Sequence, residues 1–254
     1  MSAREPLESL DAALVQARVR AALEEDAAGS DATVAYLGIG DTPARAEIRV
    51  SSTTVACGVE VAREVFRQVD ERIRFEPGVH DGARLDAGAR ICSVQGPARS
   101  ILAGERTALN FLQRLCGVAS LASRFVDAVR DTGVTILDTR KTTPLWRDLE
   151  KYAVRCGGAR NHRRDLGAMI LVKDNHVCAI GGRAALLDRI AAAPRAPFVE
   201  VEVDTPAFLL ELLASPAASR IDRVMLDNFS PRDIAGALPA IEGYRARGAR
   251  LEVE

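Results

Sequence analysis

The chain has 254 residues, of which 48% are hydrophobic and 27% charged, and its formal net charge is −1. This composition is typical of a globular protein with a sizeable core, in one large domain or two modest ones, and it argues against intrinsic disorder. The balanced charge indicates neither a nucleic-acid nor a membrane-surface partner, and no apolar run is long enough to span a bilayer. Any strongly basic site must therefore be a local cluster.

The N-terminal segment and the cysteines favour a cytoplasmic location. Residues 1–26 form an acidic amphipathic pattern without the apolar core of a signal peptide. The five cysteines are odd in number and none belongs to a Cys-x-x-Cys motif, so we expect neither a disulfide framework nor a zinc site. Each cysteine is instead expected to be a small buried side chain.

The first half of the chain predicts a small α+β domain. Residues 1–30 have the apolar spacing of a helix. Short β-type runs follow at 46–50, 72–75 and 89–94, with one helix at about 58–69 among them. Residues 105–130 carry an apolar stripe at helical spacing, and Gly117 is expected to break this stretch into two helices.

Strand and helix alternate after residue 130. Apolar runs at 134–137, 169–172, 198–203, 223–226 and 250–253 predict strands, and 148–156, 184–192, 206–214 and 231–247 predict helices. The helix at 148–156 should bury Leu149, Tyr152, Ala153 and Cys156 and end at Gly157-Gly158. Repeated βα units imply a parallel sheet, and without a GxGxxG motif a barrel is preferred to a dinucleotide-binding sheet.

Ionisable residues follow the ends of the predicted strands. Arg140 and Lys141 come after the run at 134–137, Lys173 after 169–172, and Asp227 after 223–226. The active site of a βα barrel forms at the carboxyl ends of its strands, so these segments are expected to converge.

The run at 198–203 alternates glutamate with valine. Glu200 and Glu202 therefore share one face of the strand and the valines share the other. Valines packed on outer helices, with the carboxylates pointing into a barrel, would give this pattern, and so would a strand with one solvated face.

The residue types gathered in this way indicate an anion-handling site. Several cations suit a substrate that carries carboxylates or phosphates. Two carboxylates beside them suit Mg²⁺ carrying a diphosphate. The residues alone thus predict an anion-handling, metal-assisted barrel enzyme.

Seven motifs, matching in order and spacing, resemble those of the quinolinate phosphoribosyltransferase family of type II phosphoribosyltransferases. They are Glu105–Leu115, Asp138–Pro144, Leu149–Gly158, Asn161–Arg163, Lys173–His176, Val201–Val203 and Met225–Asn228. The resemblance implies an α/β fold, with an N-terminal α+β sandwich domain at 1–107 followed by an incomplete, open α/β barrel at 108–254. It also implies a homodimer, with a hexamer as the larger alternative, in which the N-terminal domain of one subunit covers the barrel mouth of the other.

The activity implied by this resemblance is phosphoribosyl transfer from phosphoribosyl pyrophosphate to quinolinate with decarboxylation, a glycosyltransferase reaction of NAD biosynthesis. The products are nicotinate mononucleotide, pyrophosphate and carbon dioxide. The paralogous activity on another aromatic acid, of the type associated with molybdenum transport, is one alternative. A non-catalytic relative is the other.

The resemblance also assigns roles to individual residues. Lys141, Glu202 and Asp227 are implied as catalytic, and Glu202 and Asp227 would hold Mg²⁺ indirectly through its pyrophosphate. The implied substrate-binding residues are Arg140, His162, Arg163, Lys173 and, from the neighbouring subunit, Arg106.

Other positions have structural expectations or depart from the family. We expect His176 to orient Lys173 or Asp174. Leu145 stands where the family usually has glycine, and a branched residue cannot take a positive φ without strain. The family continues past the position of Glu254 with a Ser-Gly-Gly loop and a last βα unit, which would cradle the 5′-phosphate.

Overall fold

The computed structural model describes residues 9–254, so the first part of the helix expected at 1–30 lies outside the described residues. The chain divides between Arg164 and Asp165 into two compact units, and each is described by itself. The domain boundary expected at residue 107 falls inside a long helix of the first unit, and the division into 1–107 and 108–254 stays a prediction.

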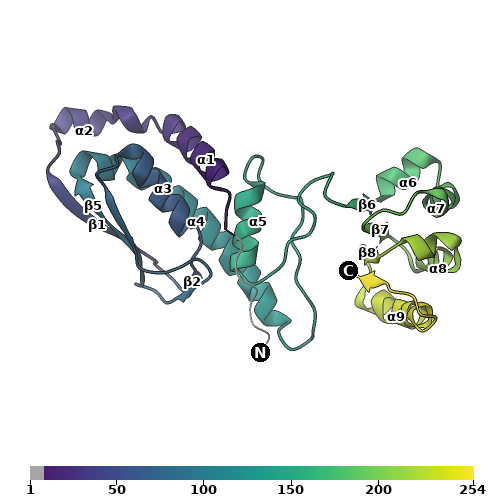
Figure 1. The fold of residues 1–254 in the computed structure, drawn as a ribbon. Coiled ribbons are helices and arrows are strands. Elements are labelled where there is room, and N and C mark those ends of the chain that lie inside the picture. The colour runs from purple at the N-terminus through teal and green to yellow at the C-terminus, as the bar shows by residue number, and fades with distance from the viewer. Residues whose placement is uncertain (1–8) are drawn as a thin grey trace. The chain divides into compact units, whose positions relative to one another are not determined.

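The first unit combines antiparallel strands with helices. Its elements are α1 (Ala12–Glu25), the 3-10 turn η1 (Ala28–Ser30), α2 (Ala32–Leu37), β1 (Pro43–Arg49), β2 (Thr54–Val55), α3 (Val59–Val69), β3 (Arg74–Pro77), β4 (Arg84–Leu85), β5 (Arg90–Pro97), α4 (Ala98–Ala128) and α5 (Arg147–Cys156) (Figure 1). The antiparallel sheet has the order β1-β5-β3, and β2 pairs separately with β4. Helix α3 packs against α4, and α1 packs against α3.

Helix α4 is continuous, and the break expected at Gly117 is wrong. Phe111, Leu115 and Ala119 are all buried in the core of the first unit, on both sides of the glycine. A glycine in a helix interior costs about 1 kcal/mol relative to alanine. Burial of the apolar stripe outweighs that cost, since each large side chain contributes about 1.5–3 kcal/mol.

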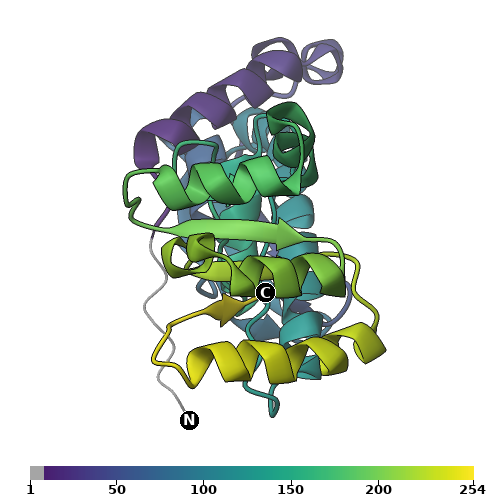
Figure 2. The same ribbon diagram turned by 90° about the vertical axis from the view of Figure 1, so that its right-hand side faces the viewer.

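The second unit is built from successive βα units. Its elements are β6 (Ile170–Val172), α6 (Asp174–Ile180), α7 (Arg183–Ala192), β7 (Val199–Val203), α8 (Pro206–Ala214), the 3-10 turn η2 (Pro216–Arg220), β8 (Arg223–Leu226), α9 (Pro231–Arg245) and β9 (Glu252–Val253). The strands form a parallel sheet in the order β6-β7-β8-β9. Figure 2 shows the helices of this unit, green to yellow, running alongside its strands. The predicted α/β fold, a sheet-containing N-terminal part followed by an open α/β barrel, is confirmed.

Strand β7 decides between the two interpretations of its alternating pattern. Val201 and Val203 are fully buried and belong to a second hydrophobic core with Leu212 of α8 and Ile241 of α9. The valines therefore pack on the helices, as a barrel strand requires. Glu200, on the opposite face, is also fully buried, so a solvated face is excluded.

Two other expectations from the sequence are wrong. The run at 134–137 is not a strand: Val134 is 59% exposed, and within the described part of the chain the segment makes only an isolated parallel bridge, from Leu137 to Arg160. Cys178 is exposed because it lies on a face of α6 that does not pack against the core, whereas the other four cysteines are buried.

One helix, α5, agrees closely with prediction, and two short helices were not predicted. Helix α5 buries Leu149, Tyr152, Ala153 and Cys156 as expected. The short helices α2 and α6 were not expected, since each spans only a turn or two. No helix among residues 9–254 combines the length and hydropathy needed to cross a bilayer.

Candidate active site

Two cationic segments of the first unit lie side by side. Leu137 and Arg160 form a parallel bridge, and the Asp138 N–H donates to the Arg160 carbonyl at 3.1 Å. This pairing places the start of the loop that carries Arg140 and Lys141 next to the segment 160–163. Two segments that are not adjacent in the sequence are thereby joined.

The loop after Lys141 is held by Glu150 in the first turn of α5. The Glu150 carboxylate accepts from the Thr143 N–H at 3.1 Å, from the Thr143 hydroxyl at 2.8 Å and from Arg114 Nη2 at 2.5 Å. Burial raises the pKa of Glu150, but the hydrogen bonds from Arg114 and Thr143 outweigh it and hold the pKa below its ordinary value. Glu150 is therefore an ionised anchor for the loop.

The side chains of Arg140 and Lys141 differ in exposure. Arg140 is half-buried, and its carbonyl accepts from the Thr142 N–H at 2.9 Å, which closes a tight turn around Lys141. Lys141 is exposed, and its N–H donates to the Thr139 hydroxyl at 3.0 Å. The backbone of Lys141 is thus fixed while its ammonium group is accessible to a ligand.

Leu145 occupies the left-handed region of backbone space, with φ of 66°. This is the position at which the sequence departs from the glycine usual in the resembled family. A side chain with a Cβ costs about 1–2 kcal/mol there. The strain lies in the same loop as Lys141, and the exposed Leu145 side chain, at 73%, gains little from packing.

His162 and Arg163 lie on the paired segment. Both are half-buried, and His162 lines a pocket of about 450 Å³ together with Lys151 and Asn161. Arg106 is on an exposed part of α4, well inside the helix and not near its start. Within the first unit the structure therefore joins Arg140, Lys141, His162 and Arg163, and it leaves Arg106 on the helix surface.

The second unit brings Lys173 and Glu202 together at the carboxyl ends of β6 and β7. Lys173 Nζ donates to Glu202 Oε2 at 2.6 Å, and the side chains are 40% and 12% exposed. The Lys173 N–H donates to His176 Nδ1 at 2.9 Å. The expectation that His176 orients Lys173 is confirmed.

Asp227 stands at the end of the neighbouring strand, β8. Its N–H donates to the Val203 carbonyl at 2.9 Å, and its carboxylate accepts from Asn228 Nδ2 at 2.6 Å. Asn228 has φ of 58°, a conformation that asparagine tolerates better than most residues. Glu202 and Asp227 thus offer oxygen ligands on adjacent strand ends, the donor type that suits Mg²⁺.

A cluster of Cys57, Asp81 and Cys156 has metal-ligand character but a structural role. One ligand atom of each lies within 4.8 Å of the others. The Asp81 carboxylate accepts from two backbone N–H groups at the start of α3, at 3.0 Å each, and from the Tyr152 hydroxyl at 2.8 Å. A hydrogen bond with Cys156 and burial raise the pKa of the Cys57 thiol, so it stays protonated. The cluster ties α3 to α5.

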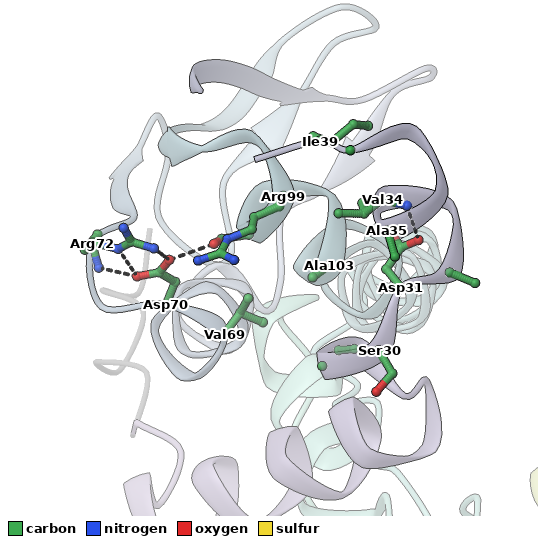
Figure 3. A pocket seen from close by; sticks show the side chains of 15 residues that line it. Ser30, Asp31, Val34, Ala35, Ile39, Val69, Asp70, Arg72, Arg99 and Ala103 are labelled. Carbon is green, nitrogen blue, oxygen red and sulfur yellow. Dashed lines mark hydrogen bonds and ion pairs between the residues drawn. The ribbon is translucent and has the colours of Figure 1, made fainter. Parts of the chain in front are cut away.

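A groove of about 950 Å³ beside α2 contains none of the predicted site residues (Figure 3). Its charged groups are engaged within the protein: Asp70 accepts from Ser100 Oγ at 2.6 Å and from Arg72 Nη2 at 2.8 Å, and Arg99 pairs with Asp41. Hydrogen bonds from Arg72 and Ser100 hold the pKa of Asp70 well below its usual range. The groove therefore offers no reactive group for the expected chemistry.

The sequence interpretation left out two buried charged residues of α5, Glu150 and Lys151, which are 7% and 4% exposed. Ionic side chains are almost never fully buried unless they are paired. One sequence signal could have found Lys151. The chain has 31 arginines but only three lysines, and the other two are the predicted site residues Lys141 and Lys173.

Comparison with protein families covers most of the chain. Residues 31–116 match the family model described as quinolinate phosphoribosyl transferase, N-terminal domain, and residues 118–254 match the corresponding C-terminal domain.

Individual relatives carry consistent names. The chain is 42% identical over 217 residues to the carboxylating nicotinate-nucleotide pyrophosphorylase of Mycobacterium leprae, which covers 83% of the chain and 74% of that protein. It is 38% identical over 215 residues to the human protein of the same name, with coverage of 84% and 70%.

Solved structures agree with these relatives. The nicotinate-nucleotide pyrophosphorylase from Francisella tularensis superposes with a TM-score of 0.84 at 36% identity, over 99% of this chain and 86% of that one. The enzyme of the same name from Ehrlichia chaffeensis gives a TM-score of 0.85 at 29% identity, over 97% and 86%.

Proposed function

Because the chain belongs to the quinolinate phosphoribosyltransferase family, we propose that it transfers the phosphoribosyl group of phosphoribosyl pyrophosphate to quinolinate with decarboxylation. The products are nicotinate mononucleotide, pyrophosphate and carbon dioxide, a step of NAD biosynthesis. The observation that carries the proposal is the pairing of the two cationic segments, 138–141 and 160–163, in the unit that also holds α5. A dianionic aromatic acid is the class of substrate that such a pair suits.

The first unit supplies the groups for quinolinate. Arg140, His162 and Arg163 would bind its two carboxylates, and bidentate arginine contacts would fix the direction of the ring nitrogen. That orientation is a large part of catalysis, because the nitrogen must reach the anomeric carbon of the ribose. A second copy of the chain would contribute Arg106, which is exposed on α4 and available to such a partner.

The second unit supplies the groups for the sugar and the leaving group. Lys173 of this unit and Lys141 of the first unit would neutralise phosphate and substrate charge. Glu202 and Asp227 would stabilise the positive charge that develops on the sugar as the bond to pyrophosphate breaks. The ring nitrogen supplies the electron pair of the new bond to the anomeric carbon, and pyrophosphate leaves with the pair of the broken bond.

Loss of carbon dioxide follows from the chemistry of the product. Once the ring nitrogen is bonded to the ribose it carries a positive charge. The electrons of the breaking carbon–carboxylate bond remain on the adjacent ring carbon, which the cationic nitrogen stabilises until a proton from water replaces the carboxylate. The contribution of the protein to this step is the orientation already fixed by its cations.

The residues present fit a magnesium cofactor. Mg²⁺ usually keeps several waters and binds through one or two carboxylates together with substrate phosphates. Glu202 and Asp227 provide carboxylates on adjacent strand ends, and the Glu202 side chain is held in place by Lys173. When bound with pyrophosphate, Mg²⁺ would supply neutralisation of the departing charge.

The assembly and location follow the same proposal. We expect a homodimer, because the quinolinate site would be incomplete without Arg106 from a second copy. We expect a cytoplasmic enzyme, since the five cysteines are free thiols and such thiols are kept reduced there.

The test is formation of nicotinate mononucleotide by the purified chain given quinolinate, phosphoribosyl pyrophosphate and Mg²⁺. Product that requires all three would support the proposal. A folded chain that makes no product with quinolinate but does so with another aromatic acid would assign it to the paralogous activity instead. Absence of Mg²⁺-dependent binding of phosphoribosyl pyrophosphate would contradict any phosphoribosyltransferase function.

A further inference from the structure

The buried pair of Asp138 and Lys151 contacts both backbone polar groups of one residue at the candidate site, His162. Asp138 Oδ1 accepts from the His162 N–H at 2.8 Å, and Lys151 Nζ donates to the His162 carbonyl at 3.0 Å. The two side chains also pair with each other, Nζ to Oδ1, at 2.5 Å. The backbone of His162 is thus held on both sides by opposite charges.

Asn161 extends this arrangement through the second oxygen of the Asp138 carboxylate. Its Nδ2 donates to Asp138 Oδ2 at 2.6 Å and to the Lys151 carbonyl at 2.9 Å, and its Oδ1 accepts from Arg155 Nη1 at 2.5 Å. Both oxygens of the Asp138 carboxylate are therefore used within the protein. Every polar atom of the Asp138 and Asn161 side chains is therefore engaged in a contact within the protein.

Burial makes the arrangement specific. The Asp138 and Lys151 side chains are 7% and 5% exposed. Such a pair needs accurate geometry and further hydrogen bonds to offset the loss of hydration, and the contacts to His162 and Asn161 provide them. Removal of either partner would leave an uncompensated charge beside the loop that carries His162 and Arg163.

The choice of lysine at position 151 is a second, independent observation. Arginine is the usual cation of this chain, with 31 arginines against three lysines. A compact ammonium group with three donors fits between one carboxylate oxygen and one carbonyl, whereas a planar guanidinium needs more space and a different set of acceptors. Lysine at this buried position therefore indicates a requirement for the smaller group.

We propose that Asp138 and Lys151 are positioning residues that set the backbone of His162, and through it the side chains of His162 and Arg163, for binding the carboxylates of the aromatic acid. The inference rests on the proposed function for the identity of the substrate. It assigns the two residues to the acid half of the site, not to the half that handles the sugar diphosphate. Their loss should therefore weaken one substrate selectively.

The experiment compares Lys151→Met, Lys151→Arg and Asp138→Asn with the wild-type chain in steady-state kinetics. Methionine keeps most of the side-chain volume and removes the donors. We expect kcat/KM for quinolinate to fall on the order of 100-fold in all three variants, because small displacements of binding groups have effects of that size. The KM for phosphoribosyl pyrophosphate should change by less than about twofold in the same variants.

The matched control is Asp127→Asn. It removes a carboxylate of the first unit that pairs with Arg84 at 2.7 Å and lies on α4, outside the loops that carry Lys141 and His162. Its kinetics should equal those of the wild type. Binding of phosphoribosyl pyrophosphate that is weakened as much as that of quinolinate in the Lys151 and Asp138 variants would overturn the proposal. Wild-type kinetics in Lys151→Arg would also overturn it.

Hydrogen exchange separates this inference from the proposed function. In the wild-type chain the His162 amide should exchange slowly, and peptides covering residues 160–164 should lose that protection in Lys151→Met and Asp138→Asn while peptides from α3 and α4 keep theirs. This readout needs no activity. If the wild-type chain forms no product, the proposed function fails, but the exchange data still test whether Asp138 and Lys151 hold the His162 backbone. Unchanged protection of residues 160–164 in the variants would reject that role.

Discussion

Lys173 Nζ lies 2.6 Å from Glu202 Oε2; Lys173 directly follows β6, and Glu202 lies in the neighbouring parallel strand, β7. The contact joins a cation that can reach a phosphate to a carboxylate that can face a developing sugar cation. Because Lys173 is 40% exposed and Glu202 only 12%, the ammonium group is the accessible member of the pair. A ligand can therefore approach the Lys173 ammonium group while the less exposed Glu202 carboxylate stays paired with it.

Lys173→Met should lower turnover by about 100- to 1,000-fold, the usual cost of removing one electrostatic contact to a transition state. Thermal stability should change little, because the side chain is well exposed. Arg183→Met is the matched control, since Arg183 forms a solvent-exposed pair of the same length with Asp204 in the same unit. Comparable losses of activity in both variants would contradict a specific role for Lys173.

Lys141→Ala should abolish measurable turnover and leave the fold intact. The side chain is exposed, so its removal takes nothing from the core, while the loss of a charge at the substrate affects every productive complex. Product formation and circular dichroism measure the two effects separately. Arg195→Ala, which removes an exposed cation between α7 and β7, should behave as wild type. Near-normal activity of Lys141→Ala would refute its assignment.

Leu145→Gly should stabilise the chain by about 0.5–1 kcal/mol. Relief of the positive φ is worth about 1–2 kcal/mol, and the larger conformational entropy of glycine in the unfolded chain offsets part of that gain. The change should appear as a higher midpoint in urea with an unchanged slope. A lower midpoint would mean that the exposed leucine makes contacts that outweigh its backbone strain.

Two glycine-to-alanine substitutions should change the free energy of unfolding in opposite directions. A Cβ at Gly157 would lie 2.4 Å from the Ala119 carbonyl oxygen and 2.7 Å from the Ala122 Cβ, so α5 could not approach α4 as closely. Gly157→Ala should therefore destabilise by about 1–3 kcal/mol, as overpacking usually does. Gly117→Ala meets nothing within 4 Å in the middle of α4 and should stabilise by about 0.5–1 kcal/mol. Denaturant unfolding of the two variants tests the pair.

The contribution of Glu150 to stability should depend on pH. Hydrogen bonds from Arg114 and Thr143 hold its pKa in the folded chain below the ordinary value of about 4.3. The carboxylate therefore stabilises the fold above that value, and the stabilisation is lost as the pH falls through the lower folded-state pKa. The difference in unfolding free energy between wild type and Glu150→Gln should be largest near pH 7 and shrink in acid. A difference that stays constant down to about pH 2 would exclude the linkage.

Most elements of the second unit, though not α6, could be predicted because each has a strong local pattern. The valines of β7 alternate with glutamates, and β8 and α8 have bounds that match the expected ones. The same argument located Lys173, Glu202 and Asp227 at neighbouring strand ends. Parallel strands put their carboxyl ends at one edge, so the order of the strands alone is enough to gather these side chains.

Tertiary packing decided the features that sequence patterns missed. Gly117 suggests a break only when it is considered locally, whereas the buried stripe of α4 continues past it. The run at 134–137 has strand composition, but among the described residues its only bridge is the one from Leu137 to Arg160. The roles of Glu150 and Lys151 depend on contacts with loops that follow or precede α5, and no periodicity encodes such contacts.

The scarcity of lysine gives the chain a chemical simplicity that experiments can use. Apart from the terminal amine, only Lys141, Lys151 and Lys173 can react with amine-directed acylating reagents, and Lys151 is shielded at 4% exposure. Acylation would therefore label the two lysines proposed to bind substrate, Lys141 and Lys173, at positions that a mass spectrometer can read separately. Occupancy by either substrate could be followed residue by residue, on the unaltered chain, as protection of one amine or the other.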